Sequence, residues 1–278
     1  MNSPPTHEYP APHIIPPTPP GLHTHTIIFL HGRGSTGLEL ADELGSSKLS
    51  GPPDANIFSQ LPHVKWVFPT AKPRFSSVFQ EEMTEWFDIY SLNDPSAKDE
   101  LQIEGLREAV LFLKGLLDAE IAIVGDSRRV ILGGISQGEA TALMVLLTGG
   151  YSLAGFVGFS GWIPFAHRIQ NGSLANSNSS TFRIRIAQDL NHLLQTSWET
   201  RGNVGYNTPV LLGHGRDDAY VDFKLGSQVR DILRNLGYEV DWCEYEGAEQ
   251  EGHWFKEPEG LDDIVKFVKE KCALSSLK

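Results

Sequence analysis

Cysteine, long apolar runs and a leader pattern are all scarce or missing in this chain of 278 residues. Its two cysteines, Cys243 and Cys272, allow one disulfide but exclude a disulfide framework, and two reduced thiols are the simpler interpretation. No apolar run approaches the roughly 20 residues that a membrane span needs. No basic N-terminus precedes an apolar segment, as it would in a secretory signal. These absences favour a cytoplasmic protein without integral membrane association.

Positive charge is also limited. The chain carries 23 Lys and Arg against 35 Asp and Glu, a formal net charge of −12. An acidic surface repels phosphate backbones, which argues against nucleic acid as a partner. Hydrophobic residues make up 40% of the chain, enough to bury a sizeable core. The composition therefore predicts a folded protein, and it does not indicate an oligomeric state.

Proline is concentrated at the N-terminus, where residues 1–24 hold eight of the 17 prolines. Proline fixes φ and removes a backbone donor, so this tail is expected to be extended or disordered. Binding of the proline pairs by a partner that recognises polyproline helices is the alternative. The folded domain is expected to span residues 25–278.

Beyond the tail, short apolar runs alternate with stretches of helical periodicity. The runs are bounded by Gly, Pro or Asp, and the predicted strands are 26–30, 64–68, 129–132, 155–159, 209–212 and 239–244. Apolar stripes predict helices within 101–117, 140–147, 229–233 and 264–268. This alternation predicts an α/β fold with a mostly parallel central sheet and helices on both faces.

One segment, at about 166–207, interrupts this alternation. It opens with a polar loop rich in Asn and Ser, and a helix-compatible stretch follows at 186–198. Long inserted loops are often functional or disordered. We therefore expect an insertion in the domain, either a flap over the site or a disordered loop.

The strongest motif is G-I-S-Q-G at residues 134–138, directly after a predicted strand and before a predicted helix. This is the context of the nucleophile elbow, in which a sharp turn raises the serine oxygen above the carboxyl edge of the sheet. The residues two before and two after the serine must lack bulk. The pattern predicts Ser136 as a nucleophile.

A serine hydroxyl needs a base, and the base in turn needs an acid that orients it. In α/β-hydrolases these partners follow the serine in the order acid, then histidine. His253 lies between the last predicted strand and the last predicted helix, which is where the base belongs. Asp217 and Asp218 follow the penultimate strand, and Asp222 is a third choice.

The tetrahedral intermediate of acyl transfer needs N–H donors for its oxyanion. The backbone of Gln137, at the start of the helix after the nucleophile, should supply one. Residues 31–37, a glycine-rich loop after the first predicted strand, should supply the second through Arg33 N–H. This loop lacks the patterns of dinucleotide- and phosphate-binding loops. No metal site and no cofactor is expected.

Together these segments resemble the phospholipase/carboxylesterase family of α/β-hydrolases, which includes acyl-protein thioesterases. The matching segments are F-L-H-G-R-G-S-T-G at 29–37, W-F-D at 86–88, G-G-I-S-Q-G at 133–138, F-S-G-W-I-P at 159–164, H-G-R-D-D-A-Y-V at 214–221 and Y-E-G at 245–247. They run in family order through nearly all of the folded part.

The resemblance implies Asp218 rather than Asp217 as the acid, and it implies that Trp86 and Trp162 lie at the acyl site. Three features depart from the family, and one of them is the insertion at about 166–207. Glu139 stands where a second small residue usually follows the elbow, and we expect either a surface residue or a disturbance of the pocket. The acidic loop between Gly247 and His253 is longer than usual.

The sequence thus predicts a serine hydrolase that cleaves carboxylic esters or thioesters through an acyl-enzyme. An acyl-protein thioesterase or carboxylesterase activity on an S-acylated protein is the first choice. A lysophospholipase or a small-ester carboxylesterase is the alternative. A non-catalytic binding protein or a peptidase on the same fold fits the motifs less well.

Overall fold

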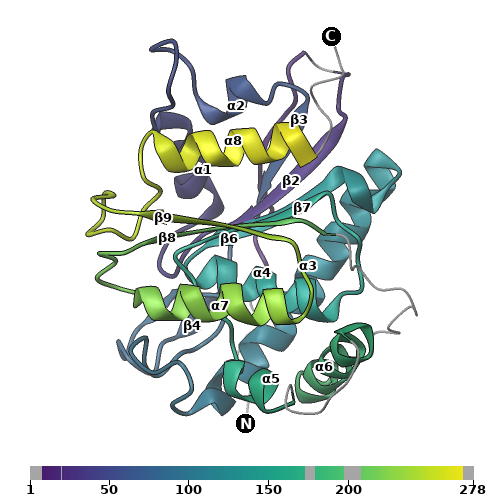
Figure 1. Ribbon diagram of the computed structural model, residues 1–278, viewed down its shortest axis with the longest axis vertical. Coiled ribbons are helices and arrows are strands. Elements are labelled where there is room, and N and C mark those ends of the chain that lie inside the picture. Colours follow the sequence, from purple (N-terminus) through teal and green to yellow (C-terminus); the bar gives the residue numbers. More distant parts are fainter. Residues whose placement is uncertain (1–7, 20, 173–178, 197–207, 272–278) are drawn as a thin grey trace.

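A seven-stranded sheet forms the centre of the computed structural model, which describes residues 8–19, 21–172, 179–196 and 208–271 (Figure 1). The strand order is β1-β3-β2-β6-β7-β8-β9. Their bounds are β1 His13–Ile15, β2 His25–Leu30, β3 Val64–Phe68, β6 Val130–Ile135, β7 Gly155–Phe159, β8 Val210–Gly215 and β9 Val240–Tyr245. Every neighbouring pair is parallel except β1 with β3. The predicted α/β fold and all six predicted strands are confirmed.

Helices cover both faces of the sheet, as the alternating pattern predicts. On one side lie α1 (Gly37–Ser46), α2 (Ile57–Gln60) and α8 (Glu259–Lys271) (Figure 1). On the other lie α3 (Gln102–Val124), α4 (Gln137–Thr148) and α7 (Phe223–Asn235). The remaining described elements are a small hairpin, two 3-10 turns and two helices. They are β4 (Pro73–Phe75) with β5 (Glu82–Thr84), the turns Asp99–Leu101 and Ser127–Arg129, and the helices α5 (Ala166–Gly172) and α6 (Ser179–Leu193).

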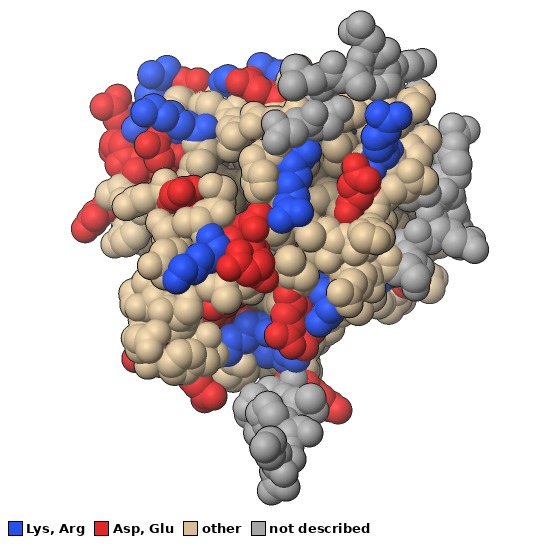
Figure 2. All heavy atoms as spheres, turned by 90° about the horizontal axis from the view of Figure 1, so that it is seen from below, with Lys and Arg blue, Asp and Glu red and all other residues tan. Residues whose placement is uncertain are grey.

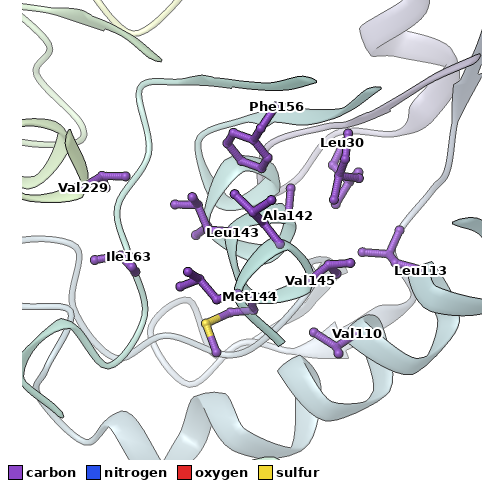
Figure 3. Packing of buried hydrophobic residues seen from close by; sticks show 14 of the residues in the cluster. Leu30, Val110, Leu113, Ala142, Leu143, Met144, Val145, Phe156, Ile163 and Val229 are labelled. Carbon is purple, nitrogen blue, oxygen red and sulfur yellow. The ribbon is translucent and has the colours of Figure 1, made fainter. Parts of the chain in front are cut away.

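The helix that follows the elbow lies inside the core. Every residue of α4 is buried, and Figure 3 shows Leu143 and Val145 of α4 surrounded by apolar side chains from α3 and the sheet. Among these neighbours are Val110 and Leu113 of α3. Burial all round this helix fixes the position of its first residue, and with it the elbow.

The N-terminal segment gives the first correction, because, of the two expected states, extended or disordered, its described part adopts the extended one. Residues 13–15 form β1 and pair with β3, so disorder is wrong for this stretch. Tyr9 packs against the domain: its ring stacks on Phe112 at 3.9 Å and lies 6.4 Å from the ring of Trp86. The prolines keep the segment extended, which suits an edge strand, because an edge leaves backbone donors unpaired in any case. Residues 1–7 lie outside the described residues.

Replacing Tyr9 by Ala should lower the free energy of unfolding by about 2 kcal/mol, because the ring loses its contacts with Phe112 and Trp86 and leaves a cavity. Chemical denaturation of the full chain measures this change. Leu22→Ala, in the same segment at a side chain that is 51% exposed, is the matched control and should change little. Equal stabilities for the two variants would contradict the packing role of Tyr9.

The insertion at about 166–207 is the second correction. It contains α5 (Ala166–Gly172) and α6 (Ser179–Leu193). Asn191 of α6 donates to Thr148 O at the C-terminal end of α4, which is the end opposite Ser136. No residue of α5 or α6 lines the pocket at the elbow. The described part of the insertion is therefore neither a flap over the site nor a disordered loop. Residues 173–178 and 197–207 lie outside the described part.

Acidic and basic side chains lie next to one another on the face shown in Figure 2, and the described residues form no continuous basic patch there. Of the two cysteines, Cys243 is a free thiol, and Cys272 is outside the described residues. Among the described helices, none has the length and apolar character needed to cross a membrane.

Candidate active site

Ser136 lies at the junction of β6 and α4 in a strained backbone conformation. Its φ is 57° and its ψ is −124°, a combination that few residues other than glycine adopt. Two glycines make the turn possible. A Cβ on Gly138 would lie 2.3 Å from Leu30 O, and one on Gly134 would lie 2.6 Å from Gly138 C. The sequence places these glycines two residues on either side of Ser136, as an elbow requires.

Asp218 and His253 are joined by a hydrogen bond of 2.8 Å between Asp218 Oδ2 and His253 Nδ1. The two residues are 35 positions apart in the chain and lie on the loops after β8 and β9. The Asp218 side chain has no exposed surface. Its other oxygen, Oδ1, accepts the backbone N–H groups of Tyr220 and Val221, each at 2.9 Å. The carboxylate is therefore fixed in orientation before it meets the imidazole.

The environment of Asp218 favours its charged form. Burial alone would raise the pKa of this carboxyl, but hydrogen bonds from His214 and His253, together with the Val221 N–H, hold the pKa well below its usual range. Asp218 is thus ionised at neutral pH. An ionised acid in this position selects the His253 tautomer with its proton on Nδ1 and leaves Nε2 free to accept a proton.

The other candidate acids point elsewhere. Asp217 Oδ2 accepts Gly247 N–H at 2.9 Å, and Asp222 accepts Lys224 N–H as the N-cap of α7. His214, the histidine nearest to the pair, is buried, and its Nε2 lies 2.9 Å from Val221 O and 3.4 Å from Asp218 Oδ2. It supports the loop rather than facing the elbow.

The loop that carries His253 is longer than expected for the family, yet it is well anchored. Gln250 and Glu251 have positive φ values of 52° and 54°, and Gly252 has a φ of 83°. Ala219 N–H donates to Glu251 O, which ties this loop to the one that carries Asp218. A Cβ on Gly252 would lie 2.8 Å from Asp217 C, so only glycine permits this approach. The extra length therefore does not separate His253 from Asp218.

The loop of the second candidate oxyanion donor touches the nucleophile. A Cβ on Gly32 would lie 3.4 Å from Ser136 Cβ and 3.8 Å from its Oγ. The adjoining Gly34 N–H donates to Thr84 O at 2.7 Å and anchors the loop to the β4–β5 hairpin. Arg33 and Gln137 both line the pocket that contains Ser136. The two residues predicted to donate to the oxyanion therefore lie at the same pocket as the nucleophile.

Trp86 is hydrogen-bonded to both segments that carry the candidate oxyanion donors. Its Nε1 donates to His31 O at 2.9 Å, and its backbone N–H donates to Gln137 Oε1 at 2.8 Å. Gln137 Nε2 in turn donates to Phe87 O. His31 is buried, which lowers its pKa to about 4, so the ring is neutral. The side-chain role of Gln137 was missed by the sequence interpretation, since no local pattern marks a contact across 51 residues.

A pocket of about 510 Å³ opens at Ser136 and His253. Its wall is mixed: Leu40, Phe79, Met83, Leu92 and Trp254 are apolar, and Glu43, Tyr220 and Glu251 are polar or charged. Trp162 lines the pocket, as the resemblance implies. Trp86 is not among the lining residues and is fully buried, so any influence on the acyl group passes through His31 and Gln137.

Among the described residues, no cluster of three or more His, Cys, Asp or Glu side chains could hold a metal ion.

Comparison with known proteins gives a consistent result. The sequence profile of the phospholipase/carboxylesterase family matches residues 11–198. A relative from Yarrowia lipolytica, acyl-protein thioesterase 1, is 31% identical over 255 residues, which cover 89% of this chain and 92% of the relative. Acyl-protein thioesterase 1 from Schizosaccharomyces pombe is 38% identical over 151 residues, which cover 54% and 61% of the two chains.

Solved structures agree with the fold. Zea mays acyl-protein thioesterase 2 superposes with a TM-score of 0.69 and 28% identity, covering 95% of this chain and all of that one. The Bacillus cereus carboxylesterase superposes with a TM-score of 0.58 and 12% identity, over 94% and 93% of the two chains, and supports the fold alone.

Proposed function

Because this chain belongs to the phospholipase/carboxylesterase family and is therefore a serine hydrolase of esters or thioesters, we propose that Ser136, Asp218 and His253 are its catalytic triad. The observation that carries this proposal is the hydrogen bond of 2.8 Å between Asp218 and His253, because His253 lines the same pocket as the strained Ser136. The hydrolase assignment leaves no support for a non-catalytic binding protein.

In the first half of the reaction, His253 Nε2 takes the proton of Ser136 Oγ as that oxygen attacks the carbonyl carbon of the substrate. The C–O π pair moves to the carbonyl oxygen, which becomes an oxyanion. The N–H groups of Arg33 and Gln137 bind this oxyanion, and because they are fixed in advance they require no reorganisation. Asp218 stabilises the imidazolium that forms.

Collapse of the intermediate expels the leaving alcohol or thiol, which takes its proton from His253. Water then enters, His253 removes a proton from it, and the hydroxide oxygen attacks the acyl carbon. The second tetrahedral intermediate collapses with release of the acid, and Ser136 Oγ regains its proton. The described residues supply every proton acceptor and donor in these steps.

We propose an acyl-protein thioesterase or carboxylesterase type of substrate. The apolar part of the pocket wall, with Phe79, Leu92 and Trp162, suits an acyl chain. A lysophospholipid or a small ester is the alternative, because the same wall accepts either. Comparing kcat/KM for esters and thioesters from acetyl to palmitoyl discriminates these classes.

A cytoplasmic location stays a prediction from the sequence.

Covalent labelling tests the proposed mechanism directly. A fluorophosphonate probe should attach to one site, and peptide mass spectrometry should place the adduct on Ser136, because only an activated hydroxyl attacks phosphorus at a useful rate. The Ser136→Ala variant should take up no label. Serine side chains remote from the triad provide the internal control. An unlabelled wild-type protein, or an adduct on another serine, would contradict the assignment of the nucleophile.

A further inference from the structure

The first turn of α4 carries a buried carboxyl that the proposed mechanism does not use. Glu139 is 2% exposed, and its Oε2 accepts the backbone N–H of Gly161 at 2.8 Å. The sequence suggests two roles for it, a surface residue or a disturbance in the pocket. The first is wrong, because the side chain is buried between α4 and the residues at the carboxyl end of β7. It does not line the pocket itself.

Two glycines form the slot that receives this side chain. A Cβ on Gly158 would lie 2.7 Å from Glu139 Cδ, and a Cβ on Gly161 would lie 2.6 Å from Glu139 Oε2. Distances this short rule out any side chain at either position unless Glu139 moves. The carboxyl therefore fills the space between α4 and the turn formed by residues 160–162, with its oxygen aimed at the backbone of that turn.

The 160–162 turn leads directly to the pocket wall. Ser160 has a positive φ of 55°, a strained conformation for a residue with a Cβ. Trp162, two residues after Ser160, lines the pocket that contains Ser136. Its ring packs edge-on against that of Phe87, with 6.1 Å between the ring centroids. The hydrogen bond from Gly161 N–H to Glu139 lies between these two residues and holds the strained turn in place.

The nucleophile is held independently of this bond. Ser136 N–H donates to Phe159 O at 2.8 Å, and Ser160 N–H donates to Gly213 O at 2.9 Å. Both hydrogen bonds join the ends of neighbouring strands, and neither involves Glu139. Loss of the carboxyl should therefore move the wall at Trp162 more than it moves the elbow.

We propose that Glu139 is a positioning residue, whose carboxyl holds the 160–162 turn and so fixes Trp162 in the wall of the catalytic pocket. It acts on substrate affinity rather than on the reacting atoms. This inference rests on the proposed hydrolase function, since it concerns the same pocket.

The protonation state of Glu139 gives the inference a second consequence. Burial raises the pKa of this carboxyl to about 8, against the opposing effect of the Gly161 N–H, and no other titratable group among the described residues contributes. The folded state therefore holds the proton more tightly than the unfolded state. The free energy of unfolding should fall as the pH rises from the ordinary pKa of a glutamate, 4.5, toward about 8. Above that pH the carboxylate is charged and has a single hydrogen bond from Gly161, so the cost of burying the charge favours movement of the side chain out of the slot toward water.

The experiment measures kcat and KM for p-nitrophenyl butyrate between pH 6 and 10 in the full chain. Glu139→Ala should raise KM about tenfold at neutral pH, with a smaller change in kcat. Glu139→Gln keeps an acceptor for Gly161 N–H and cannot ionise, so its KM should match the wild type at neutral pH. Above pH 8 the wild-type KM should rise, whereas the Glu139→Gln KM should stay constant.

Glu120→Gln is the matched control. Glu120 is also buried, but its carboxylate accepts hydrogen bonds from Thr26 Oγ1 and Lys65 Nζ. These residues lie near the amino ends of β2 and β3, whereas the candidate site lies at the carboxyl ends of the strands. It should cost stability and leave KM and its pH dependence unchanged. The inference would be overturned if the wild type is active but its KM depends on pH in the same way as that of Glu139→Gln. It would also be overturned if Glu120→Gln shows the same rise in KM as Glu139→Ala. Wild type without turnover would contradict the proposed function instead.

Discussion

Replacing Ser136 by Ala should lower kcat by about a million-fold, the scale found when a triad nucleophile is removed. The change deletes a single oxygen. Ala lacks any other atom that could form the acyl-enzyme, and the strained turn can keep its shape because Gly134 and Gly138 still permit the close backbone approach. KM should change little, because the pocket wall is intact. Steady-state turnover of p-nitrophenyl butyrate measures both parameters.

Some activity should survive the loss of Ser136. The N–H groups of Arg33 and Gln137 still bind an oxyanion when water attacks, so a rate above that of the uncatalysed reaction is expected. Ala strains the backbone at this φ about as much as Ser does, so the unfolding transition serves as the control and should be nearly unchanged. A stable variant that retained full turnover would exclude Ser136 as the nucleophile.

The parts of the fold that could be predicted are those where the pattern is local. Buried parallel strands appear as short apolar runs because both of their faces are covered, and all six such runs became strands of the sheet. The N-terminal segment could not be predicted in this way. Its proline content indicates an extended chain, but pairing of His13–Ile15 with β3 depends on residues 51 to 55 positions away.

In the candidate site, too, the residues that a local pattern marks could be predicted, and those that depend on distant residues could not. Ser136 and His253 could be identified from chain order and from the elbow pattern, and the choice of Asp218 over Asp217 needed the family resemblance. Glu139 shows the limit. Its identity suggests an exposed position, since carboxyls are rarely buried without a partner. Only the glycines at 158 and 161, distant in sequence and adjacent in space, create the slot that buries it.

Replacing Asp218 by Asn should lower kcat by about ten-thousand-fold near neutral pH, as expected when a triad acid loses its charge without losing its shape. The Asn carbonyl can still accept the N–H groups of Tyr220 and Val221, so the amide faces His253 Nδ1 in place of Oδ2. An amide donates at that position. Its donation selects the His253 tautomer with the proton on Nε2, and that nitrogen can then no longer take the proton of Ser136.

Asp217→Asn is the matched control for this prediction, because Asp217 neighbours Asp218 but bonds to Gly247 N–H and not to His253. An Asn oxygen replaces that acceptor, so turnover should stay within a few-fold of the wild type. The fluorophosphonate labelling rate should fall in parallel with kcat for Asp218→Asn, since both depend on removal of the Ser136 proton by His253. Equal losses in the two variants would instead indicate that the loop between β8 and α7 acts through its shape, with no particular role for the Asp218 charge.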